Sequence, residues 1–224
     1  MSVNYLTQTT IRLPMPDADV TYYPHFFTDE ESDLFFQELL DTVDWQHEKI
    51  RLFNKEISQP RLTAWYGDIG KAYTYSGITM QPQLWTPILL TIKKKIESFT
   101  NISFNSVLLN LYRDGKDSVA WHSDDEPELR ANPNIASVSL SSQRVFQFRH
   151  KLNKDLARRS FPLAKGSLLI MQGTTQHYWQ HQIPKTAKVV QPRINLTFRT
   201  IDPSLKQNHL HWFAELNHDC LLLV

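Results

Sequence analysis

The chain has one cysteine, Cys220, among its 224 residues. A single cysteine excludes an internal disulfide framework and fits a protein that works in a reducing compartment. No stretch approaches the roughly 20 apolar residues of a membrane span, and the opening MSVNYLTQTTIRL lacks the basic and apolar regions of a secretory signal. We therefore expect a soluble intracellular protein with no membrane partner, cytoplasmic in a bacterium and nuclear or cytoplasmic in a eukaryote.

A strong charge of either sign is also missing, since the formal net charge at pH 7 is only +1. This excludes a protein that is basic overall, but a local basic patch can still bind nucleic acid. The segment from Arg149 to Lys165 is one candidate, and an ordinary solvated loop is an equally good interpretation of it. Its basic residues, set against the single acid Asp155, are Arg149, Lys151, Lys154, Arg158, Arg159 and Lys165.

No internal repeat or Gly/Ser-rich linker divides the chain, so we expect one domain spanning residues 1–224. A capping-box pattern, Thr28 with Glu31, precedes a helical apolar stripe, and Thr86 with Pro87 opens a second helix. From about residue 105 short β-type runs follow, which are SVLLNLY, ASVSLS, RVFQFRH, GSLLIMQ and RINLTFRT. Two smaller β segments are expected at residues 61–66 and 72–77. Helices followed by many short strands predict an α+β protein built around a β-sandwich or jelly roll.

The stretch AWHSDDEPE, from Ala120 to Glu128, crowds a histidine against four carboxylates. A solvated acidic turn explains it simply, as it does for most charge runs. A metal site is the alternative, because His122 and Asp124 at i and i+2 point to the same face of an extended strand. His177 or His181, both in HYWQHQIP, would complete a two-histidine, one-carboxylate set, which is the arrangement of non-haem Fe(II) oxygenases.

The strand RINLTFR alternates strictly between apolar and polar residues, and the polar ones are Arg193, Asn195, Thr197 and Arg199. That polar face suits either solvent or a pocket for an anion. Arginine pairs with carboxylate through a planar fork and keeps its charge, so two arginines would meet the two ends of a dicarboxylate. Spacing alone favours the solvent-facing interpretation. Upstream, Asn110 and Tyr112 share one face of SVLLNLY, where they offer hydrogen bonds to an acid or satisfy the protein's own polar groups.

The order N-x-Y, H-x-D, a distal histidine and R-x-N-x-T-x-R, together with PRLTAWYGD, YTYSG and WQHQIP, makes the chain recognisable. It resembles the AlkB family of Fe(II)- and 2-oxoglutarate-dependent dioxygenases, particularly the animal DNA-repair members, over roughly Pro60 to Thr200. The resemblance implies a double-stranded β-helix (jelly-roll) core over about residues 105–201. It also implies N-terminal helices packed on one sheet and a nucleotide-recognition lid within about residues 1–104, with a C-terminal tail at 202–224.

Position by position, the resemblance gives three groups of residues a role. The iron ligands are His122, Asp124 and His181, and His181 is chosen over His177 because it holds the place in W-x-H-x-[IV]-P. The 2-oxoglutarate contacts are Asn110, Tyr112, Arg193, Asn195, Thr197 and Arg199. The substrate contacts are the lid residues Tyr66, Tyr73 and Tyr75, stacked on a base, and Asp125 near the target base. The polar face of RINLTFR then lines a pocket, against the interpretation from spacing alone.

The resemblance implies an enzyme that uses Fe(II), 2-oxoglutarate and O2 to demethylate N-alkylated bases of the 1-methyladenine or 3-methylcytosine type in DNA or RNA. The products are formaldehyde, succinate and CO2, beside the repaired base. We expect a monomer whose substrate base is flipped out of the helix and whose basic segment, with Arg144 beside it, holds phosphates. Three alternatives stay open: a similar oxygenase acting on protein or lipid, a non-catalytic nucleic-acid-binding jelly roll, and a jelly roll with a structural metal.

Overall fold

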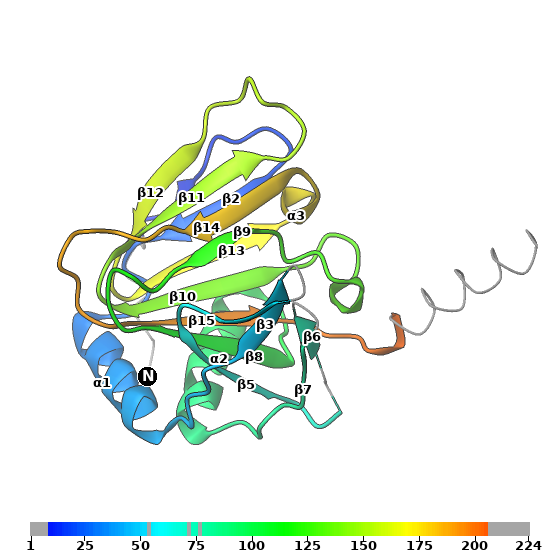
Figure 1. Cartoon of the computed structure of the whole chain (residues 1–224). Coiled ribbons are helices and arrows are strands. Elements are labelled where there is room, and N and C mark those ends of the chain that lie inside the picture. Colours follow the sequence, from blue (N-terminus) through cyan, green and yellow to red (C-terminus); the bar gives the residue numbers. More distant parts are fainter. Residues whose placement is uncertain (1–8, 53–54, 71–72, 76–77, 206–224) are drawn as a thin grey trace, which may run out of the picture.

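Two antiparallel β-sheets form the body of the computed structural model, which describes residues 9–52, 55–70, 73–75 and 78–205 (Figure 1). The larger sheet has seven strands, in spatial order β1 (Ile11–Arg12), β2 (Asp19–Tyr23), β13 (Ser167–Gln172), β10 (Ile135–Ser141), β15 (Arg193–Arg199), β8 (Ser106–Tyr112) and β5 (Leu62–Gly67). The smaller sheet has four, in the order β12 (Arg159–Leu163), β11 (Arg144–His150), β14 (Trp179–Ile183) and β9 (Val119–His122).

From β8 onward the chain crosses repeatedly between the two sheets, which is the connectivity of a jelly roll and confirms the predicted fold class. The five predicted strands correspond to β8, β10, β11, β13 and β15, and the two smaller β segments to β5 and β6 (Tyr73–Tyr75). The larger sheet also contains β2 and β5, which precede the expected core at residues 105–201. The basic segment is not entirely a loop, because Phe161 and Leu163 of β12 pack into the apolar layer between the sheets.

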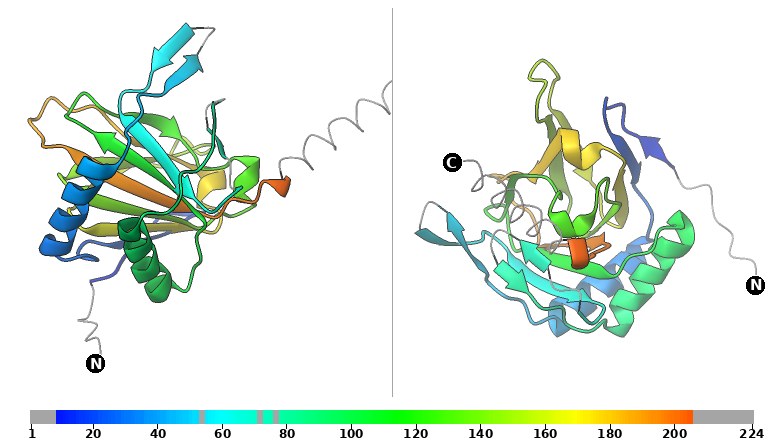
Figure 2. Two further views of the ribbon diagram at one scale, coloured as in Figure 1. Left: turned by 90° about the horizontal axis from the view of Figure 1, so that it is seen from below. Right: turned by 90° about the vertical axis from the view of Figure 1, so that its right-hand side faces the viewer.

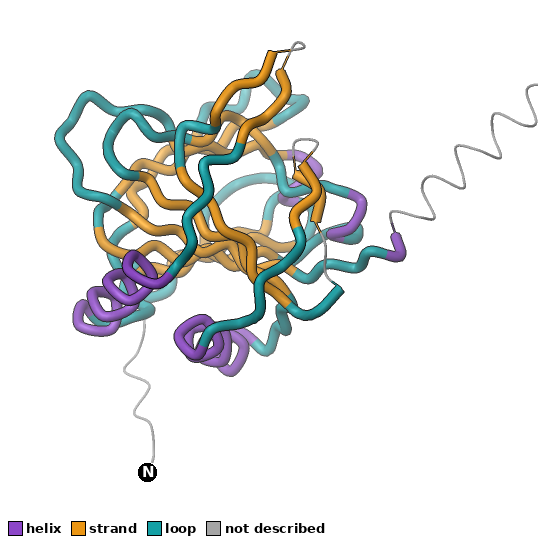
Figure 3. The backbone as a smooth tube through the Cα atoms, turned by 60° about the horizontal axis from the view of Figure 1, so that its bottom comes forward, coloured by secondary structure: helices purple, strands orange, loops and turns teal. Residues whose placement is uncertain are grey.

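Two long helices, α1 (Asp29–Thr42) and α2 (Pro87–Thr100), cover the outer face of the larger sheet (Figure 3). The predicted capping box opens α1, since Thr28 Oγ1 accepts from the Glu31 backbone N–H at 3.2 Å and the Thr28 N–H donates to Glu31 Oε2 at 2.9 Å. The apolar stripes of both helices pack on the sheet, with Leu39 and Ile92 fully buried. This packing excludes water from one face of the sheet.

The strand β15 shows how the sequence pattern and the layers fit together. Its apolar residues Ile194, Leu196 and Phe198 belong to the cluster under the helices. Its polar residues therefore point the other way, into the space between the sheets, and every residue of the strand is buried. The solvent-facing interpretation of the polar face is wrong, because β15 lies between β10 and β8 with both faces covered.

The remaining elements lie outside the two sheets. A hairpin of β3 (Lys49–Leu52) and β4 (Lys55–Ser58) projects from the body of the protein (Figure 2), and β6 pairs with β7 (Ile78–Met80) in a second hairpin. A short helix α3 (Thr175–Tyr178) and a 3₁₀ turn (Pro127–Leu129) complete the described elements. Within the described ranges, no helix is both long enough and apolar enough to cross a membrane.

Candidate functional site

A cavity between the two sheets holds most of the residues that the sequence singles out. Its polar lining includes the three expected iron ligands and all six expected 2-oxoglutarate contacts: His122, Asp124, His181, Asn110, Tyr112, Arg193, Asn195, Thr197 and Arg199. Its apolar lining includes Leu108, Val119, Phe146, Met171 and Ile183. The cavity therefore has an apolar wall and a larger set of polar and charged groups that converge on it, which suits a small polar ligand.

Strand pairing brings the two histidines together. His122 and His181 are register partners on β9 and β14, and their ring centroids lie 4.2 Å apart. The His122 Nδ1 lies 2.8 Å from the Ala120 carbonyl oxygen. A carbonyl only accepts, so Nδ1 carries the hydrogen and Nε2 the lone pair that a metal needs. Burial lowers the pKa of both imidazoles, that of His181 to about 3, so both are neutral at pH 7.

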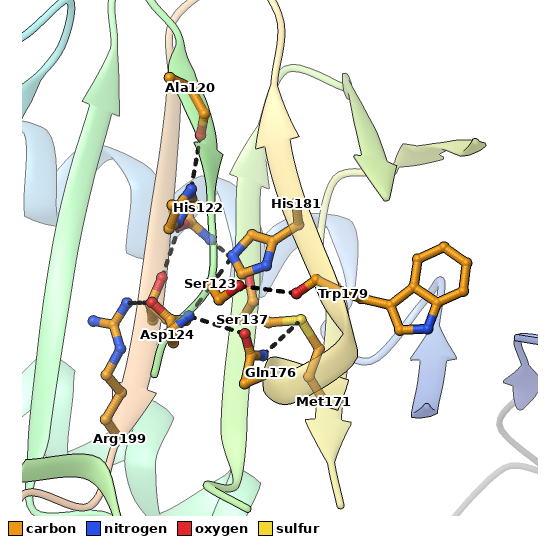
Figure 4. A network of polar contacts seen from close by, with 12 residues as sticks. Ala120, His122, Ser123, Asp124, Ser137, Met171, Gln176, Trp179, His181 and Arg199 are labelled. Atoms are coloured by element: carbon orange, nitrogen blue, oxygen red, sulfur yellow. Dashed lines mark hydrogen bonds and ion pairs between the residues drawn. The ribbon is translucent and has the colours of Figure 1, made fainter. Parts of the chain in front are cut away.

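Asp124 lies just beyond the end of β9 and is held from two sides (Figure 4). Its backbone N–H donates to Gln176 Oε1 at 2.9 Å, and its Oδ1 accepts from Arg199 Nη2 at 2.7 Å. Burial raises the pKa of Asp124, but the positive charge and hydrogen bond of Arg199 outweigh burial and bring the pKa to about 2. The carboxylate is therefore ionised and oriented.

The residues present fit a divalent iron ion. One ligand atom from each of His122, Asp124 and His181 lies within 4.8 Å of the others, in the two-histidine, one-carboxylate combination of non-haem Fe(II) enzymes. The Asp124 Oδ2 and the His181 Nδ1 are buried and make no hydrogen bond in the described part of the chain. A buried carboxylate oxygen without a partner is costly, and a cation among these three residues would satisfy it.

Arg193 marks a second polar point of the cavity. The residue is 1% exposed, and its Nη2 donates to Ser139 Oγ at 2.8 Å. Its Nε and Nη1 are buried and make no hydrogen bond to a described residue. Its guanidinium lies 5.2 Å from the ring centroid of Tyr112. Burial lowers the pKa of Arg193 to about 10, so it remains a cation at neutral pH. Two buried nitrogens of a guanidinium cation that lack partners suit a carboxylate ligand.

Asn195 and Thr197 are bound mainly to the protein itself. Asn195 Nδ2 donates to Ser137 Oγ at 2.8 Å and to the Val138 carbonyl at 2.9 Å, and Thr197 Oγ1 donates to Asn195 Oδ1 at 3.0 Å. They line the cavity while holding β15 to β10. The supporting serines were missed in the sequence, although Ser137 and Ser139 alternate with apolar residues in ASVSLS just as the polar residues of β15 do.

Of the three expected base-stacking residues, Tyr66 is the one whose side chain the structure describes. Tyr66 is 3% exposed and belongs to the cluster under the helices, on the face of β5 opposite to Thr63 and Trp65. A side chain packed there cannot stack on a base without opening the core, so Tyr66 is placed as a core residue. Tyr73 and Tyr75 are residues of strand β6, and their side chains fall outside the described part of the structure.

Asp125 is at the surface beside the site. Its carboxylate is half exposed and accepts from Lys151 Nζ at 2.8 Å, and the same Nζ donates to the Gln176 carbonyl at 2.8 Å. Arg144 is not part of a basic surface, because it is 4% exposed and donates to three backbone carbonyls, those of Asp114, Asp117 and Pro184. Its guanidinium instead joins the loop that precedes β9 to the segment that follows β14.

Comparison with known proteins agrees with this geometry. Residues 19–199 match the 2OG-Fe(II) oxygenase superfamily, from β2 to the end of β15. The chain is 47% identical to "Alpha-ketoglutarate-dependent dioxygenase alkB homolog 3" of Mus musculus over 198 residues, which is 85% of this chain and 68% of that protein. It is 43% identical to "DNA oxidative demethylase ALKBH2" of Homo sapiens over 188 residues, 80% of this chain and 72% of the relative.

A solved structure, "The structure of OsALKBH1", superposes with a TM-score of 0.56 at 17% identity, covering 86% of this chain and 100% of the other. At this identity the likeness shows a shared fold. The superfamily match covers most of the chain, and the similar proteins carry AlkB names at more than 40% identity. The chain therefore belongs to the 2OG-Fe(II) oxygenase superfamily, within its AlkB family.

Proposed function

We propose that this protein is an oxidative nucleic-acid demethylase that removes N-methyl groups of the 1-methyladenine or 3-methylcytosine type. It would use Fe(II), 2-oxoglutarate and O2, and release formaldehyde, succinate and CO2. The names of its relatives, one a dioxygenase and one a DNA oxidative demethylase, support this reaction class.

The observation that carries the proposal is the shared cavity of the His122–Asp124–His181 triad and Arg193. A buried guanidinium with two nitrogens that lack hydrogen-bond partners is stabilised by an anion. A 2-oxo acid with a second carboxylate satisfies both ends of the site, since one end chelates a metal and the other pairs with Arg193. This combination supports an oxygenase over a structural metal site, which needs no anion pocket.

The bound iron, with 2-oxoglutarate and O2, would supply the oxidation of a methyl C–H bond to a hydroxymethyl group. The protein's own residues would hold the metal and the 2-oxo acid and would shelter the reacting atoms from water. The triad would bind the metal, Arg193 would orient the far carboxylate, and Phe146 with Ile183 would keep water from the reacting atoms. The hydroxymethyl group on nitrogen then leaves as formaldehyde, which restores the base.

Basic side chains at the surface support a nucleic-acid substrate. Arg149 lies 4.5 Å from the ring centroid of Trp121, which directly precedes His122, and Arg158 lies 5.7 Å from the same ring. Exposed Lys154 and Arg159 add charge to this edge of the smaller sheet. Such contacts would hold phosphates without reading sequence, while a flipped or single-stranded base enters the cavity. We propose that one copy of the chain suffices, as a monomer.

The test is methyl removal from a 1-methyladenine oligonucleotide by the iron-loaded protein with 2-oxoglutarate, followed by mass spectrometry of the strand. His181→Ala should abolish methyl loss, and His177→Ala, which changes an exposed histidine four residues earlier, should leave it intact. Succinate formed without methyl loss from single-stranded DNA, duplex DNA or RNA would point to a protein or lipid substrate. Neither succinate nor methyl loss would point to a binding protein.

A further inference from the structure

Two buried asparagines line the cavity, and the protein uses them differently. Asn195 Nδ2 donates to Ser137 Oγ and to the Val138 carbonyl, so both of its N–H groups bind within the protein. Asn110 is instead bonded through its oxygen, because its Oδ1 accepts from Arg61 Nε at 2.6 Å. Of this pair, Asn110 is therefore the one whose N–H groups are not committed to β10.

The Arg61 contact fixes which way round the Asn110 amide lies. An arginine Nε–H can only donate, so the atom that faces it must be the amide oxygen and not the amide nitrogen. Asn110 is 5% exposed and lines the cavity, and a planar amide with its oxygen toward Arg61 turns its Nδ2 away from Arg61. Without this donor, the amide could turn over and present an acceptor to the cavity instead.

Arg61 itself is well placed to hold such an orientation. It directly precedes β5, where Thr63 is the register partner of Asn110. Its side chain is only 4% exposed, and its backbone N–H donates to the Gln59 carbonyl at 2.8 Å. A buried, charge-assisted hydrogen bond between neighbouring strands is short and directional. The sequence motif PRLTAWYGD, which begins at Pro60, carries this arginine, and the iron triad and the two arginines of β15 do not explain it.

We propose that Arg61 is a positioning residue for the 2-oxo acid: by donating to Asn110 Oδ1, it presents Asn110 Nδ2 as a hydrogen-bond donor to an oxygen of the bound 2-oxo acid. The proposal rests on the proposed function, in which Asn110 contacts 2-oxoglutarate. Arg61 acts only through Asn110, so its contribution to binding depends on that amide being present.

The experiment is a double-mutant cycle on 2-oxoglutarate affinity, measured by calorimetry on full-length protein loaded with Mn²⁺, so that no turnover occurs. Arg61→Met should raise the dissociation constant of 2-oxoglutarate about tenfold, and Asn110→Ala should do so by at least as much. In the Asn110→Ala background, Arg61→Met should have almost no further effect, because the amide it orients is gone. Arg130→Met, at a 64% exposed arginine, serves as the control that should change nothing.

If Arg61→Met weakens binding equally in both backgrounds, or does not weaken it at all, the positioning role is overturned. Arg61→Lys covers the case in which Arg61→Met does not fold. It keeps the buried charge but lacks an Nε–H, so it should retain a native melting temperature and still bind 2-oxoglutarate more weakly. If the wild-type protein binds Mn²⁺ but no 2-oxoglutarate, both the proposed function and this inference are overturned. If the wild type does bind 2-oxoglutarate, the double-mutant cycle tests the role of Arg61 alone.

Discussion

Arg199 Nη2 lies 2.7 Å from Asp124 Oδ1, and the two side chains are 3% and 1% exposed. This buried pair joins β15 of the larger sheet to the segment that follows β9, which carries a metal ligand. The arginine stabilises the ionised carboxylate, and only the ionised form is a good metal ligand. The position of the carboxylate thus depends on a residue far along the chain.

Arg199→Met should weaken Mn²⁺ binding about 10–100-fold in the absence of 2-oxoglutarate, as expected when an outer partner of a metal ligand is lost. Without the guanidinium, burial favours the protonated acid, and the metal must displace a proton. Arg199→Lys keeps the charge, and its Mn²⁺ affinity should lie between those of the wild type and Arg199→Met. Titration calorimetry at pH 7 measures the effect, and an unchanged Mn²⁺ affinity in Arg199→Met would contradict this account.

Arg193 and Arg144 provide a matched pair of buried arginines, 5.2 Å and 5.6 Å from the same Tyr112 ring centroid. Arg193→Met should leave the free energy of unfolding of the ligand-free protein unchanged or raise it by about 1–3 kcal/mol, because a buried charge with two nitrogens that lack partners is removed. Arg144→Met should lower it by about 2–4 kcal/mol, because three backbone carbonyls lose their donor.

The affinity for 2-oxoglutarate should show the opposite order: Arg193→Met should lose it and Arg144→Met should keep it. Arg193→Met should cost about 2–5 kcal/mol of 2-oxoglutarate binding, which is more than a tenfold loss of affinity. Arg144→Met, where it folds, should bind 2-oxoglutarate normally. Urea unfolding and calorimetry together check both statements, and a strong destabilisation by Arg193→Met would show that its nitrogens are satisfied by the protein.

Tyr66 should behave as a core residue. Tyr66→Ala should lower the free energy of unfolding by about 3–5 kcal/mol, because it leaves a cavity in the apolar cluster under the helices. Tyr66→Phe should keep both native stability and methyl removal, since the packed ring stays. The measurement is urea unfolding beside the oligonucleotide assay. A Tyr66→Phe protein that is as stable as wild type but fails to remove methyl groups would restore a substrate role for the hydroxyl.

Asp117 should give the ligand-free protein a pH dependence that does not involve the metal ligands. Burial raises the pKa of Asp117, but hydrogen bonds from the Arg113 backbone and guanidinium outweigh burial and hold the pKa below its ordinary value. A carboxylate with a lowered folded pKa stabilises the protein above its unfolded pKa of about 3.9, and this stabilisation is lost as pH falls through the folded pKa.

Asp117→Asn should therefore lower the free energy of unfolding at pH 7 by about 1–3 kcal/mol, and the two proteins should converge as pH falls below about 4. Urea unfolding between pH 7 and pH 3 follows the difference. The exposed Asp41→Asn is the control, with no expected change at either pH. A difference that stays constant down to pH 3 would mean that the charge of Asp117 contributes nothing.

Local patterns predicted much of the secondary structure correctly. The capping box at Thr28 and the alternation of RINLTFR depend on neighbours within a few residues, so the chain alone specifies them. The edge strand β12 was not predicted, because Arg159–Leu163 contains a basic residue and a proline, which are typical of a loop. Pairing with β11 and packing of Phe161 between the sheets made it a strand.

The sequence by itself determined the chemistry available to this protein: the H-x-D pair, the distal His181 and the two arginines at the ends of one alternating strand. Only the tertiary structure decided which way these groups face. An alternating strand has two faces that the sequence cannot tell apart, and the helices that bury Ile194 and Leu196 turn Arg193 inward. Tyr66 is buried for the same reason: the helices cover the face of β5 to which its side chain points.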